Sequence, residues 1–443
     1  MNMKYYVIVG GTFVDVAPHF AFAAPAFGEV GRKLSGILES ALYDAGRRDV
    51  EVVPLFTRMA IGGADRMGYE QKVLSDAGLE DLRTNADVAK LLDYLVSDPE
   101  TKAIIMPAAI CDFEATGTFP SHADPYLGGE VMGKAEHPRL DSDKLRMITV
   151  KSAEKVAKRI RRKRKDIFLC LFKNTAGDDA PTQYAKGLKL LKRSSANLVF
   201  ANDTRTRLNM VITPEQARYH ETLDRDEALR GFAEMIALRS HLRFTRSTVV
   251  EGEAVAWESE EIPDSLRRVV DHCIRRGAYK PFLGATVGHF AARGKGGSIL
   301  TSRRGTNFND LVNVGLVRIE AKGGDEVIAH GSKPSVGGMS QRIIFNEHPD
   351  VDCIVHFHCP RKESSGVPVR EQRPYECGSH ECGQNTSDGL ESFAGLKAVM
   401  LDQHGPNVVF HHSENPAHVI DFIETNFDLS GRTDGEVNLA AVS

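Results

Sequence analysis

Two histidines, His356 and His358, stand one residue apart in the apolar run VDCIVHFHCP. In an extended strand, side chains at positions i and i+2 point to the same side, so the two imidazoles are expected to project together. A third histidine, His404, follows another apolar run and precedes Gly405 in LDQHG. Three imidazoles that leave one coordination position open are typical of a catalytic zinc site. The spacing alone leaves a second interpretation open, in which the histidines are structural residues of a core strand.

A polar stretch, RPYECGSHECG, carries five side chains that can move protons or bind metal: Glu376, Cys377, His380, Glu381 and Cys382. Their spacing matches no closed zinc motif. Three interpretations stay open, namely a metal site of Cys377, His380 and Cys382, a polar active-site loop, and an ordinary surface loop. His380 and Glu381 are the candidate catalytic residues, because imidazoles and carboxylates are common general acids and bases.

In the first half, apolar runs end in glycine-rich or polar turns. The run YYVIV precedes Gly10, Gly11 and Thr12, and glycines there permit a tight turn and close backbone approach to an anion. An ordinary turn between strand and helix is the alternative interpretation. Other apolar runs are followed by Ala108, Ala109 and Asp112, and by Asn202 and Asp203. Carboxyl ends of parallel strands are where doubly wound folds bind ligands, so these turns are candidate binding segments.

The composition is that of a soluble globular protein. The chain has 443 residues, 42% of them hydrophobic, and a formal net charge of −4, so no basic field favours nucleic acid. Seven unevenly spaced cysteines indicate reduced thiols. No apolar stretch approaches the ~20 residues that span a bilayer, and the amino terminus reads as a strand and not as a signal peptide. A soluble, cytoplasmic protein without nucleic-acid or membrane partners is expected.

Short apolar runs alternate with helical patterns through the first half. The expected strands are Tyr5–Val9, Val52–Leu55, Ala103–Met106, Ile167–Phe172 and Leu198–Ala201. Helices are expected between them, at Gly31–Ala45, Ala86–Val96 and, in a strongly basic segment, Lys151–Asp166. Apolar strands separated by helices indicate a parallel sheet covered on both faces, so an α/β, Rossmann-like doubly wound fold is predicted for residues 1–255. A strand at Val249–Trp257 is expected to end this half.

A second domain is predicted from residue 263 to residue 428. Its first helix places Leu266, Val269, Val270, Cys273 and Ile274 on one face, with Pro263 at the start and Gly277 at the stop. The expected strands are Ser298–Thr301, Leu311–Ile319, Cys353–His358, Ala398–Leu401 and Asn407–Phe410, with a helix at Ser335–Glu347. Residues 429–443 are predicted to be a flexible tail.

Four segments of this second half stand in a characteristic order: TVGHFAAR, SILTSRRGTNFNDL, SKPSVGGMSQRIIFNEHPDVDCIVHFH and LDQHG. In this order they resemble the class II aldolase/adducin family. The resemblance implies an α/β domain with Zn²⁺ or another divalent metal bound by His356, His358 and His404. It also implies a phosphate-binding role for Thr286, Thr301 and Ser335, and a lyase of the aldehyde-lyase type.

The chain departs from the family pattern at several positions. The family's catalytic glutamate falls at Gly337, and a glycine cannot transfer a proton. Val336 replaces the second serine of the phosphate-binding pair, His289 the loop asparagine and Ala291 the loop serine. Either another residue supplies proton transfer, or the domain binds a metal and a ligand without that chemistry. Retro-aldol cleavage, epimerisation, dehydration and decarboxylation all stay open.

The first half carries a second set of matching residues: Gly10, Gly11, Thr12, Asp15, Gly28, Gly31, Ala108, Ala109, Asp112, Phe113, Lys144, Lys189, Lys192, Asn202 and Asp203. Residues 1–215 thereby resemble the phosphopantothenate–cysteine ligase family. The resemblance implies a nucleoside triphosphate, CTP or ATP, bound with Mg²⁺ and used to activate a carboxylate. Lys189 is then the first choice for stabilising phosphate charge, with Lys186 or Lys192 as the fallback, and Asp112 is a further catalytic candidate.

The carboxylate end of this implied site differs from the family. The segment APAFG places Ala24, Ala26 and Phe27 where the family has an asparagine and two serines. The residues at the nucleotide end of the implied site match the family pattern better than those at the carboxylate end. This implies a nucleotide-binding domain that acts on a different small molecule. Three functions are therefore considered: a bifunctional enzyme, a coenzyme A pathway ligase with an inactive aldolase-like appendage, and a non-catalytic binding protein. Both families also imply a homo-oligomer and phosphorylated or carboxylated substrates.

Overall fold

Seven strands of the N-terminal half form one sheet in the computed structural model, which describes residues 3–17, 19–62, 64–120, 146–323, 326–335 and 338–442. The sheet order is β11 (Arg218–Thr222), β10 (Asn209–Ile212), β9 (Leu198–Asp203), β8 (Phe168–Thr175), β5 (Thr101–Met106), β1 (Met3–Val9) and β4 (Val50–Phe56). Three residues discussed above, Lys144, Val336 and Gly337, lie outside the described residues.

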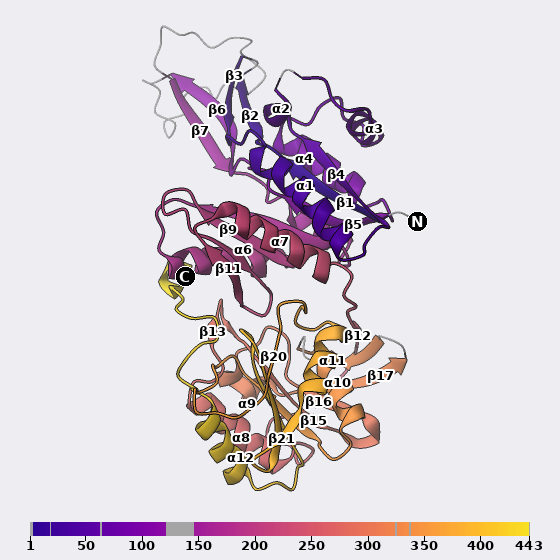
Figure 1. Cartoon of the computed structure of the whole chain (residues 1–443), viewed down its shortest axis with the longest axis vertical. Helices are drawn as coiled ribbons and strands as arrows, with labels where there is room; N and C mark the ends of the chain where they lie inside the picture. Colours follow the sequence, from indigo (N-terminus) through magenta and orange to yellow (C-terminus); the bar gives the residue numbers. More distant parts are fainter. Residues whose placement is uncertain are drawn as a thin grey trace. The chain divides into compact units, whose positions relative to one another are not determined.

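The strand order is that of a doubly wound fold. Strand β1 pairs in parallel with both β4 and β5, and β5 pairs in parallel with β8. Numbered along these central strands, the order β4-β1-β5-β8-β9 is 2-1-3-4-5, which reverses beside β1. Helix α1 (Glu29–Asp44) packs against β1 and β4 and buries Leu34, Leu38 and Leu42 at helical spacing (Figure 1). The predicted α/β fold class is confirmed.

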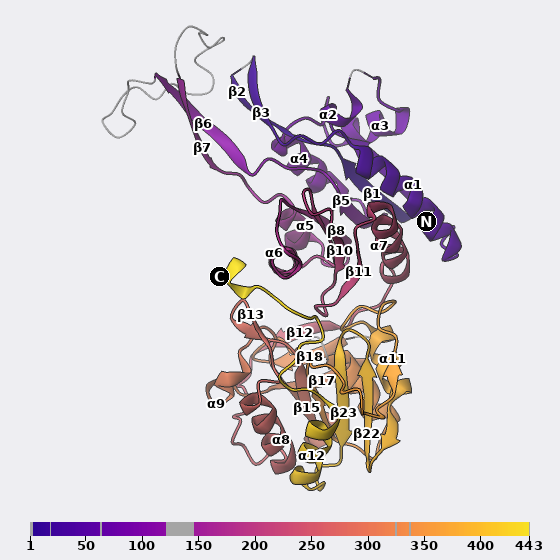
Figure 2. The ribbon, with the colours of Figure 1, turned by 60° about the vertical axis from the view of Figure 1, so that its left-hand side comes forward.

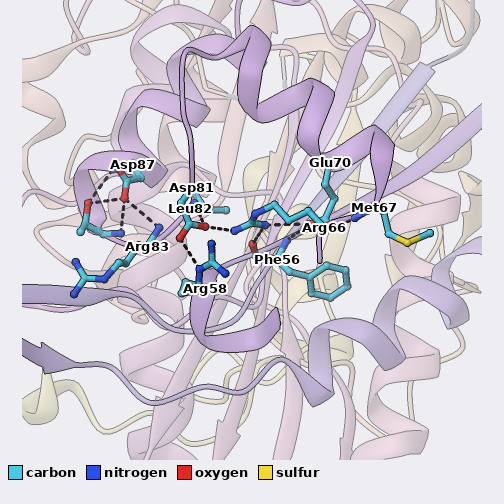
Figure 3. A network of polar contacts seen from close by, with 10 residues as sticks. Phe56, Arg58, Arg66, Met67, Glu70, Asp81, Leu82, Arg83 and Asp87 are labelled. Atoms are coloured by element: carbon cyan, nitrogen blue, oxygen red, sulfur yellow. Dashed lines mark hydrogen bonds and ion pairs between the residues drawn. The ribbon is translucent and has the colours of Figure 1, made fainter. Parts of the chain in front are cut away.

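A network of charged side chains fixes the segments that follow β4 (Figure 3). The buried Glu70 of α3 (Gly68–Asp76) accepts hydrogen bonds from the Phe56 backbone and the Arg66 guanidinium, at 2.9 and 3.4 Å. Arg66 also contacts Asp81, whose carboxylate accepts a 2.6 Å bond from Arg58. Burial alone would raise the pKa of Asp81, but the two guanidiniums outweigh it and lower that pKa. The charges are therefore paired, as buried charges require.

A ten-stranded sheet carries the C-terminal half. Its order is β12 (Arg246–Val250), β18 (Glu326–His330), β17 (Val317–Gly323), β16 (Ile299–Thr301), β15 (His289–Arg293), β19 (Cys353–His356), β23 (Gly405–Phe410), β22 (Leu396–Leu401) and β20 (Val369–Arg370), and β21 (Glu391–Phe393) pairs with β22. Figure 2 labels β15, β23 and β22 within it. By packing, the chain divides into two compact units, Met1–Phe172 with Lys192–Phe200 and Leu229–Ser240, and Lys173–Leu191 with Ala201–Ala228 and His241–Ser443.

The two faces of this second sheet bury different side chains. On one face, Val355 and Phe357 pack with apolar residues of α8 (Asp264–Arg275) and α12 (Pro416–Asn426), two helices that lie side by side in Figures 1 and 2. On the other face, Ile354 packs with Ile344 of α10 (Gly338–Glu347). His356 and His358 share the parity of Ile354 and therefore lie on the α10 face.

Several predicted elements differ from the structure. Residues 311–319 were expected to be one strand, but α9 (Leu311–Val314) and β17 share them, because Gly315 at φ 65° breaks the extended run. The basic segment 151–166 holds only the short helix α5 (Lys158–Lys163), because its first residues end β7 (Arg146–Ser152). The strand expected at 249–257 is confined to β12, at residues 246–250. The apolar face predicted for α8 is confirmed.

Candidate metal centre and neighbouring sites

Three adjacent strands position the histidines of the C-terminal half. In the antiparallel register, His356 of β19 lies opposite His289 of β15 on one side and opposite Asn407 of β23 on the other. His404 immediately precedes β23. Gly405, at φ 149°, lets the two strands approach, because a Cβ there would lie 2.1 Å from the Phe357 carbonyl oxygen. Only glycine fits this crossing without strain.

The three predicted metal ligands come together. The ring centroids of His356, His358 and His404 lie 4.7–5.1 Å apart, and all three side chains are buried. One ring nitrogen from each lies within 4.8 Å of the others. Sequence spacing left this juxtaposition open, since His404 stands directly before a different strand, β23. The arrangement matches a tetrahedral metal site in which three imidazoles fill three of the four ligand positions.

The tautomer of His356 suits a metal ligand. Its Nδ1–H donates to the Pro406 carbonyl oxygen at 2.8 Å, which leaves the lone pair on Nε2. That Nε2 is buried and has no hydrogen-bond partner among the described residues. Burial lowers the pKa of His356 to about 4, against the opposing effect of the Pro406 bond, so the ring is neutral at physiological pH. A neutral imidazole with an unmatched, buried lone pair is what a metal requires.

A fourth histidine, His289, belongs to this cluster. Its ring centroid lies 4.7 Å from that of His356, and its Nδ1 accepts a 3.0 Å hydrogen bond from the Gln341 side-chain amide. Burial, and then the neighbouring His356, lowers the pKa of His289 well below 6.5. The Gln341 bond places the His289 proton on Nε2. The sequence identifies His289 only as the residue that stands where the family has its loop asparagine. Its position opposite His356 depends on strand register, which the residue spacing does not show.

Further buried polar atoms of the C-terminal half have no hydrogen-bond partner among the described residues: Tyr279 Oη, Ser302 Oγ, Ser335 Oγ, Gln341 Oε1 and Asn407 Oδ1. The Ser302 backbone bonds to Phe290, next to His289, and the Ser335 backbone bonds to Ser302. Buried polar groups are normally satisfied, so such a group of orphans indicates a site for a polar ligand. Ser302 directly follows the predicted Thr301 and was missed, although it stands in the same LTSRRGT segment.

Two of the predicted phosphate-loop hydroxyls are engaged within the protein. Thr286 Oγ1 lies 3.3 Å from the Thr306 carbonyl oxygen and accepts a 3.1 Å bond from the Phe308 backbone. Thr301 Oγ1 lies 3.3 Å from the Phe290 carbonyl oxygen. Ser335 is the predicted residue whose hydroxyl remains available for a ligand.

The loop containing residues 376–382 caps a helix. Ser379 accepts a hydrogen bond from the Cys382 backbone and begins α11 (His380–Gly389). Glu381 accepts bonds from the Arg243 backbone and guanidinium at 3.0 and 3.1 Å. Among the described residues, Cys377, His380 and Cys382 do not gather ligand atoms at metal-binding distance. Their hypothetical metal site is therefore not formed, and His380 and Glu381 remain unassigned candidates.

In the N-terminal half, the glycine-rich turn joins two strand ends. Ala109 donates to the Gly10 carbonyl oxygen and Thr12 donates to the Ala109 carbonyl oxygen, at 2.9 and 3.0 Å. A Cβ on Gly11 would lie 2.0 Å from the Ala24 carbonyl oxygen. The buried Thr12 hydroxyl donates to Asn85 and accepts from the Cys111 backbone. The turn thus lies beside the reversal of strand order at β1, where doubly wound folds bind ligands.

The other predicted residues of this half are spread over several turns. Gly28 is the residue before α1, at φ 86°. Asp112 is exposed and forms a 2.5 Å ion pair with Lys155. Asn202 is buried in β9. Asp203 accepts bonds from the Thr175 hydroxyl and from backbone N–H groups at residues 177, 178, 205 and 206.

Three lysines were candidates for phosphate stabilisation. Lys189 Nζ donates to the Val442 carbonyl oxygen at 2.8 Å, and Lys186 forms a 2.7 Å ion pair with Asp178. Lys192 lies in the last turn of α6 (Ala180–Ser194). The segment predicted as a flexible tail therefore contacts α6, and Asp434 within it accepts a 2.8 Å bond from Tyr184.

A comparison with known protein families supports the resemblance of the C-terminal half. Residues 269–362 match the family model described as Class II Aldolase and Adducin N-terminal domain, a range that includes His356 and His358 but ends before His404. No curated protein matches the chain. Among the described residues, no helix combines the length and apolarity needed to cross a membrane.

Similar solved structures fall into the same two groups. A DNA/pantothenate metabolism flavoprotein from Streptococcus pneumoniae is 16% identical, with a TM-score of 0.40, over 53% of this chain and 96% of that one. An L-fuculose 1-phosphate aldolase is 17% identical, with a TM-score of 0.29, over 37% and 83%. A putative aldolase/epimerase/decarboxylase, YgbL from Escherichia coli, is 18% identical, with a TM-score of 0.29, over 37% and 84%.

Proposed function

We propose that the C-terminal half is a divalent-metal-dependent lyase-type domain that acts on a small polar metabolite. The observation that carries this proposal is the His356 ring, whose Nδ1–H donates to the Pro406 carbonyl while its buried Nε2 has no partner in the described part of the chain. His356, His358 and His404 would hold the metal. The family match over residues 269–362, a range that contains His356 and His358, supports the assignment of these two ligands.

A metal bound there would polarise a substrate carbonyl or hydroxyl oxygen and stabilise the negative charge that develops on it. The chain's own residues define the rest of the site. The Ser302 and Ser335 hydroxyls and the Asn407 amide oxygen are available to orient polar substrate groups. The His289 Nε2–H, set by the bond from Gln341, is a hydrogen-bond donor beside His356. His289 therefore takes a substrate-orienting role in this proposal, and a neutral imidazole can also exchange a proton.

The N-terminal half is proposed to use a nucleoside triphosphate, so that the chain is a bifunctional enzyme of small-molecule metabolism. The specific support is the turn Gly10–Thr12, which meets Ala109 beside the reversal of strand order at β1. Backbone N–H groups at such a turn bind phosphate oxygens. The altered APAFG segment argues for an acceptor other than the one used by phosphopantothenate–cysteine ligases.

Two measurements test the two halves separately. Elemental analysis of the purified protein is expected to find about one divalent metal per chain in the histidine cluster, and a substrate screen with the metal-loaded protein is expected to give aldehyde or ketone products. Calorimetric titration with ATP and CTP in the presence of Mg²⁺ tests the first half. Robust cysteine-dependent ligation of phosphopantothenate would instead establish a coenzyme A pathway ligase, and ligand binding without turnover would favour a binding protein.

A further inference from the structure

A second group of metal-binding side chains lies at the other end of the strands that carry the histidine cluster. Asp352 directly precedes β19, and His411 and His412 directly follow β23. In this antiparallel pair Cys353 lies opposite Phe410, so Asp352 and His411 are neighbours at one end, whereas the three histidines described above stand at the other. One ligand atom from each of Asp352, His411 and His412 lies within 4.8 Å of the others.

The contacts within this group converge on one carboxylate oxygen. His412 Nδ1 forms a short contact with Asp352 Oδ2, and His411 Nε2 lies 3.8 Å from the same oxygen. The Asp352 side chain is 16% exposed, whereas those of His411 and His412 are 48% and 55% exposed. The other oxygen, Oδ1, is buried and has no hydrogen-bond partner of ordinary geometry among the described residues, while the Cys353 thiol is in weak hydrogen-bonding contact with the carboxylate. The carboxylate is thus partly desolvated and incompletely satisfied, which favours a cation beside it.

The backbone around these side chains is fixed. The Ser265 hydroxyl donates to the His412 carbonyl oxygen at 2.7 Å, and the Glu414 N–H donates to that of His411 at 2.9 Å. His411 Nδ1 lies 2.8 Å from Ser413 Oγ. The Ser413 backbone N–H donates to the same Nδ1 at 3.2 Å, so Nδ1 is an acceptor and the ring proton lies on Nε2, which faces Asp352. A metal bound at Nε2 would replace that proton, while the contacts of Nδ1 with Ser413 hold the orientation of the ring.

Two cationic side chains, those of Arg293 and Lys397, come from residues that contact Asp352 or the nearby Asp350, and both are engaged in other bonds. The Arg293 backbone N–H bonds to the Asp352 carbonyl, but its guanidinium donates to the carbonyl oxygens of Val351, Phe345 and His348. Lys397 pairs with the neighbouring Asp350 at 2.8 Å. Neither supplies its charge to the Asp352 carboxylate in these contacts.

We propose that Asp352, His411 and His412 form a second, surface-exposed site for a divalent transition metal. The ligand set, two imidazole nitrogens and one carboxylate oxygen, suits Zn²⁺ and Co²⁺, with water in the remaining positions. Bonds of about 2.0–2.1 Å place tetrahedral ligand atoms roughly 3.3–3.5 Å apart, a separation that small rotations of two exposed imidazoles reach. The ion ties the end of β19 to the end of β23 and so braces the strand pair that presents the histidine cluster.

The test is a titration of chelator-stripped, full-length protein with Zn²⁺ and, for absorption spectroscopy, Co²⁺. The wild type is expected to bind two ions per chain, and both His356→Ala/His358→Ala and His411→Asn/His412→Asn are expected to bind one. A control variant, His272→Asn/His418→Asn, alters two other histidines that pair with glutamates and is expected to keep both ions. Zn²⁺ is also expected to raise the melting temperature of His356→Ala/His358→Ala.

The outcomes separate this site from the function proposed above. If His411→Asn/His412→Asn binds as many ions as the wild type with unchanged affinities, the second site does not exist. A single ion that is lost only in His356→Ala/His358→Ala also overturns it. A single ion lost only in His411→Asn/His412→Asn supports the surface site and contradicts metal binding at the histidine cluster. Because His411 and His412 are half exposed, their replacement is expected to leave the fold intact.

Discussion

The Nδ1 atom of His356 lies 2.8 Å from the carbonyl oxygen of Pro406, two residues after His404. The segment that contains the predicted ligand His404 therefore also fixes the tautomer of the predicted ligand His356. Because Pro406 has no N–H of its own, its carbonyl oxygen is its only backbone hydrogen-bonding group at this crossing. The coupling means that displacement of β23 disturbs two ligands at once.

Replacement of the strand histidines is expected to abolish metal binding at the cluster. His356→Ala/His358→Ala removes two of three imidazoles, so the variant should contain about one metal ion fewer per chain than the wild type. Elemental analysis after gel filtration measures this loss. His272→Ala, which removes an imidazole bonded to Glu424 between α8 and α12, is the matched control and should keep the full metal content. Equal metal content in all three proteins would contradict the assignment.

Gly405→Ala is expected to damage both stability and metal affinity. A Cβ would lie 2.1 Å from the Phe357 carbonyl oxygen at a φ that alanine rarely adopts, so the free energy of unfolding should fall by more than about 2 kcal/mol. The displaced His404 should weaken Zn²⁺ binding at least tenfold. Urea denaturation and a competitive chelator assay measure the two effects. Gly36→Ala, with open space around its Cβ inside α1, should instead be neutral or stabilising by up to about 1 kcal/mol.

Asp203 gives a pH-dependent contribution to stability. Burial would raise its pKa, but the hydrogen bonds from backbone N–H groups and from Thr175 outweigh this and lower the pKa well below 3.8. The stabilisation is therefore fully present above about pH 4, the ordinary aspartate pKa, and is lost as the pH falls toward the folded-state value. Asp203→Asn should unfold at lower urea concentration at pH 7, and its deficit should shrink below pH 4. A deficit that is constant from pH 7 to pH 3 would rule out this titration.

The Thr12 hydroxyl is expected to be structural. Thr12→Val leaves Asn85 Oδ1 and the Cys111 N–H without the buried partner that they have in the structure, which costs about 1–3 kcal/mol of unfolding free energy. Thr116→Val is the control, because its hydroxyl bonds to Thr149 at an exposed position and its loss should change stability by less than about 0.5 kcal/mol. Chemical denaturation followed by circular dichroism distinguishes the two variants. Equal stability of both variants would contradict this structural role of the Thr12 hydroxyl.

Lys189 is the lysine expected to matter for nucleotide binding. Lys189→Met removes a charged group that donates to the Val442 backbone carbonyl, so stability should change little while affinity for ATP or CTP with Mg²⁺ falls at least tenfold. Lys186→Met removes the ion pair with Asp178 and should leave nucleotide affinity nearly unchanged. Calorimetric titration compares the two variants. The reverse ranking would assign the phosphate contact to Lys186.

Helices and strands with a clear hydrophobic periodicity could be predicted from the sequence. Contacts that depend on how the strands pair could not. The apolar face of α8 was visible because Leu266, Val269 and Cys273 recur at helical spacing. The parallel strands were visible as continuous apolar runs. The break at Gly315 was missed, because a glycine inside an apolar run does not reveal its φ. Element boundaries of this kind depend on tertiary contacts.

The residues of the candidate site also fall into those that the sequence could predict and those that it could not. His356 and His358 could be paired from the alternation of a strand alone. The positions of His289 and Asn407 could not be predicted, because they depend on which residues of β15 and β23 pair with His356. The contact between Gln341 of α10 and His289 could not be predicted either. The hydroxyl of Ser302 was passed over for that of Thr301, because sequence comparison cannot show which hydroxyl already has a partner.

The pairing of His356 with Asn407 sets a limit on how the gene can change. A one-residue insertion or deletion within β19 would turn His356 and His358 to the opposite face of the sheet, into the space filled by Val355 and Phe357. The same slip would separate Asp352 from His411. Length variation among descendants of this chain should therefore be excluded from residues 352–358 and 404–412 and should collect in the connections between strands, even where point substitutions are frequent.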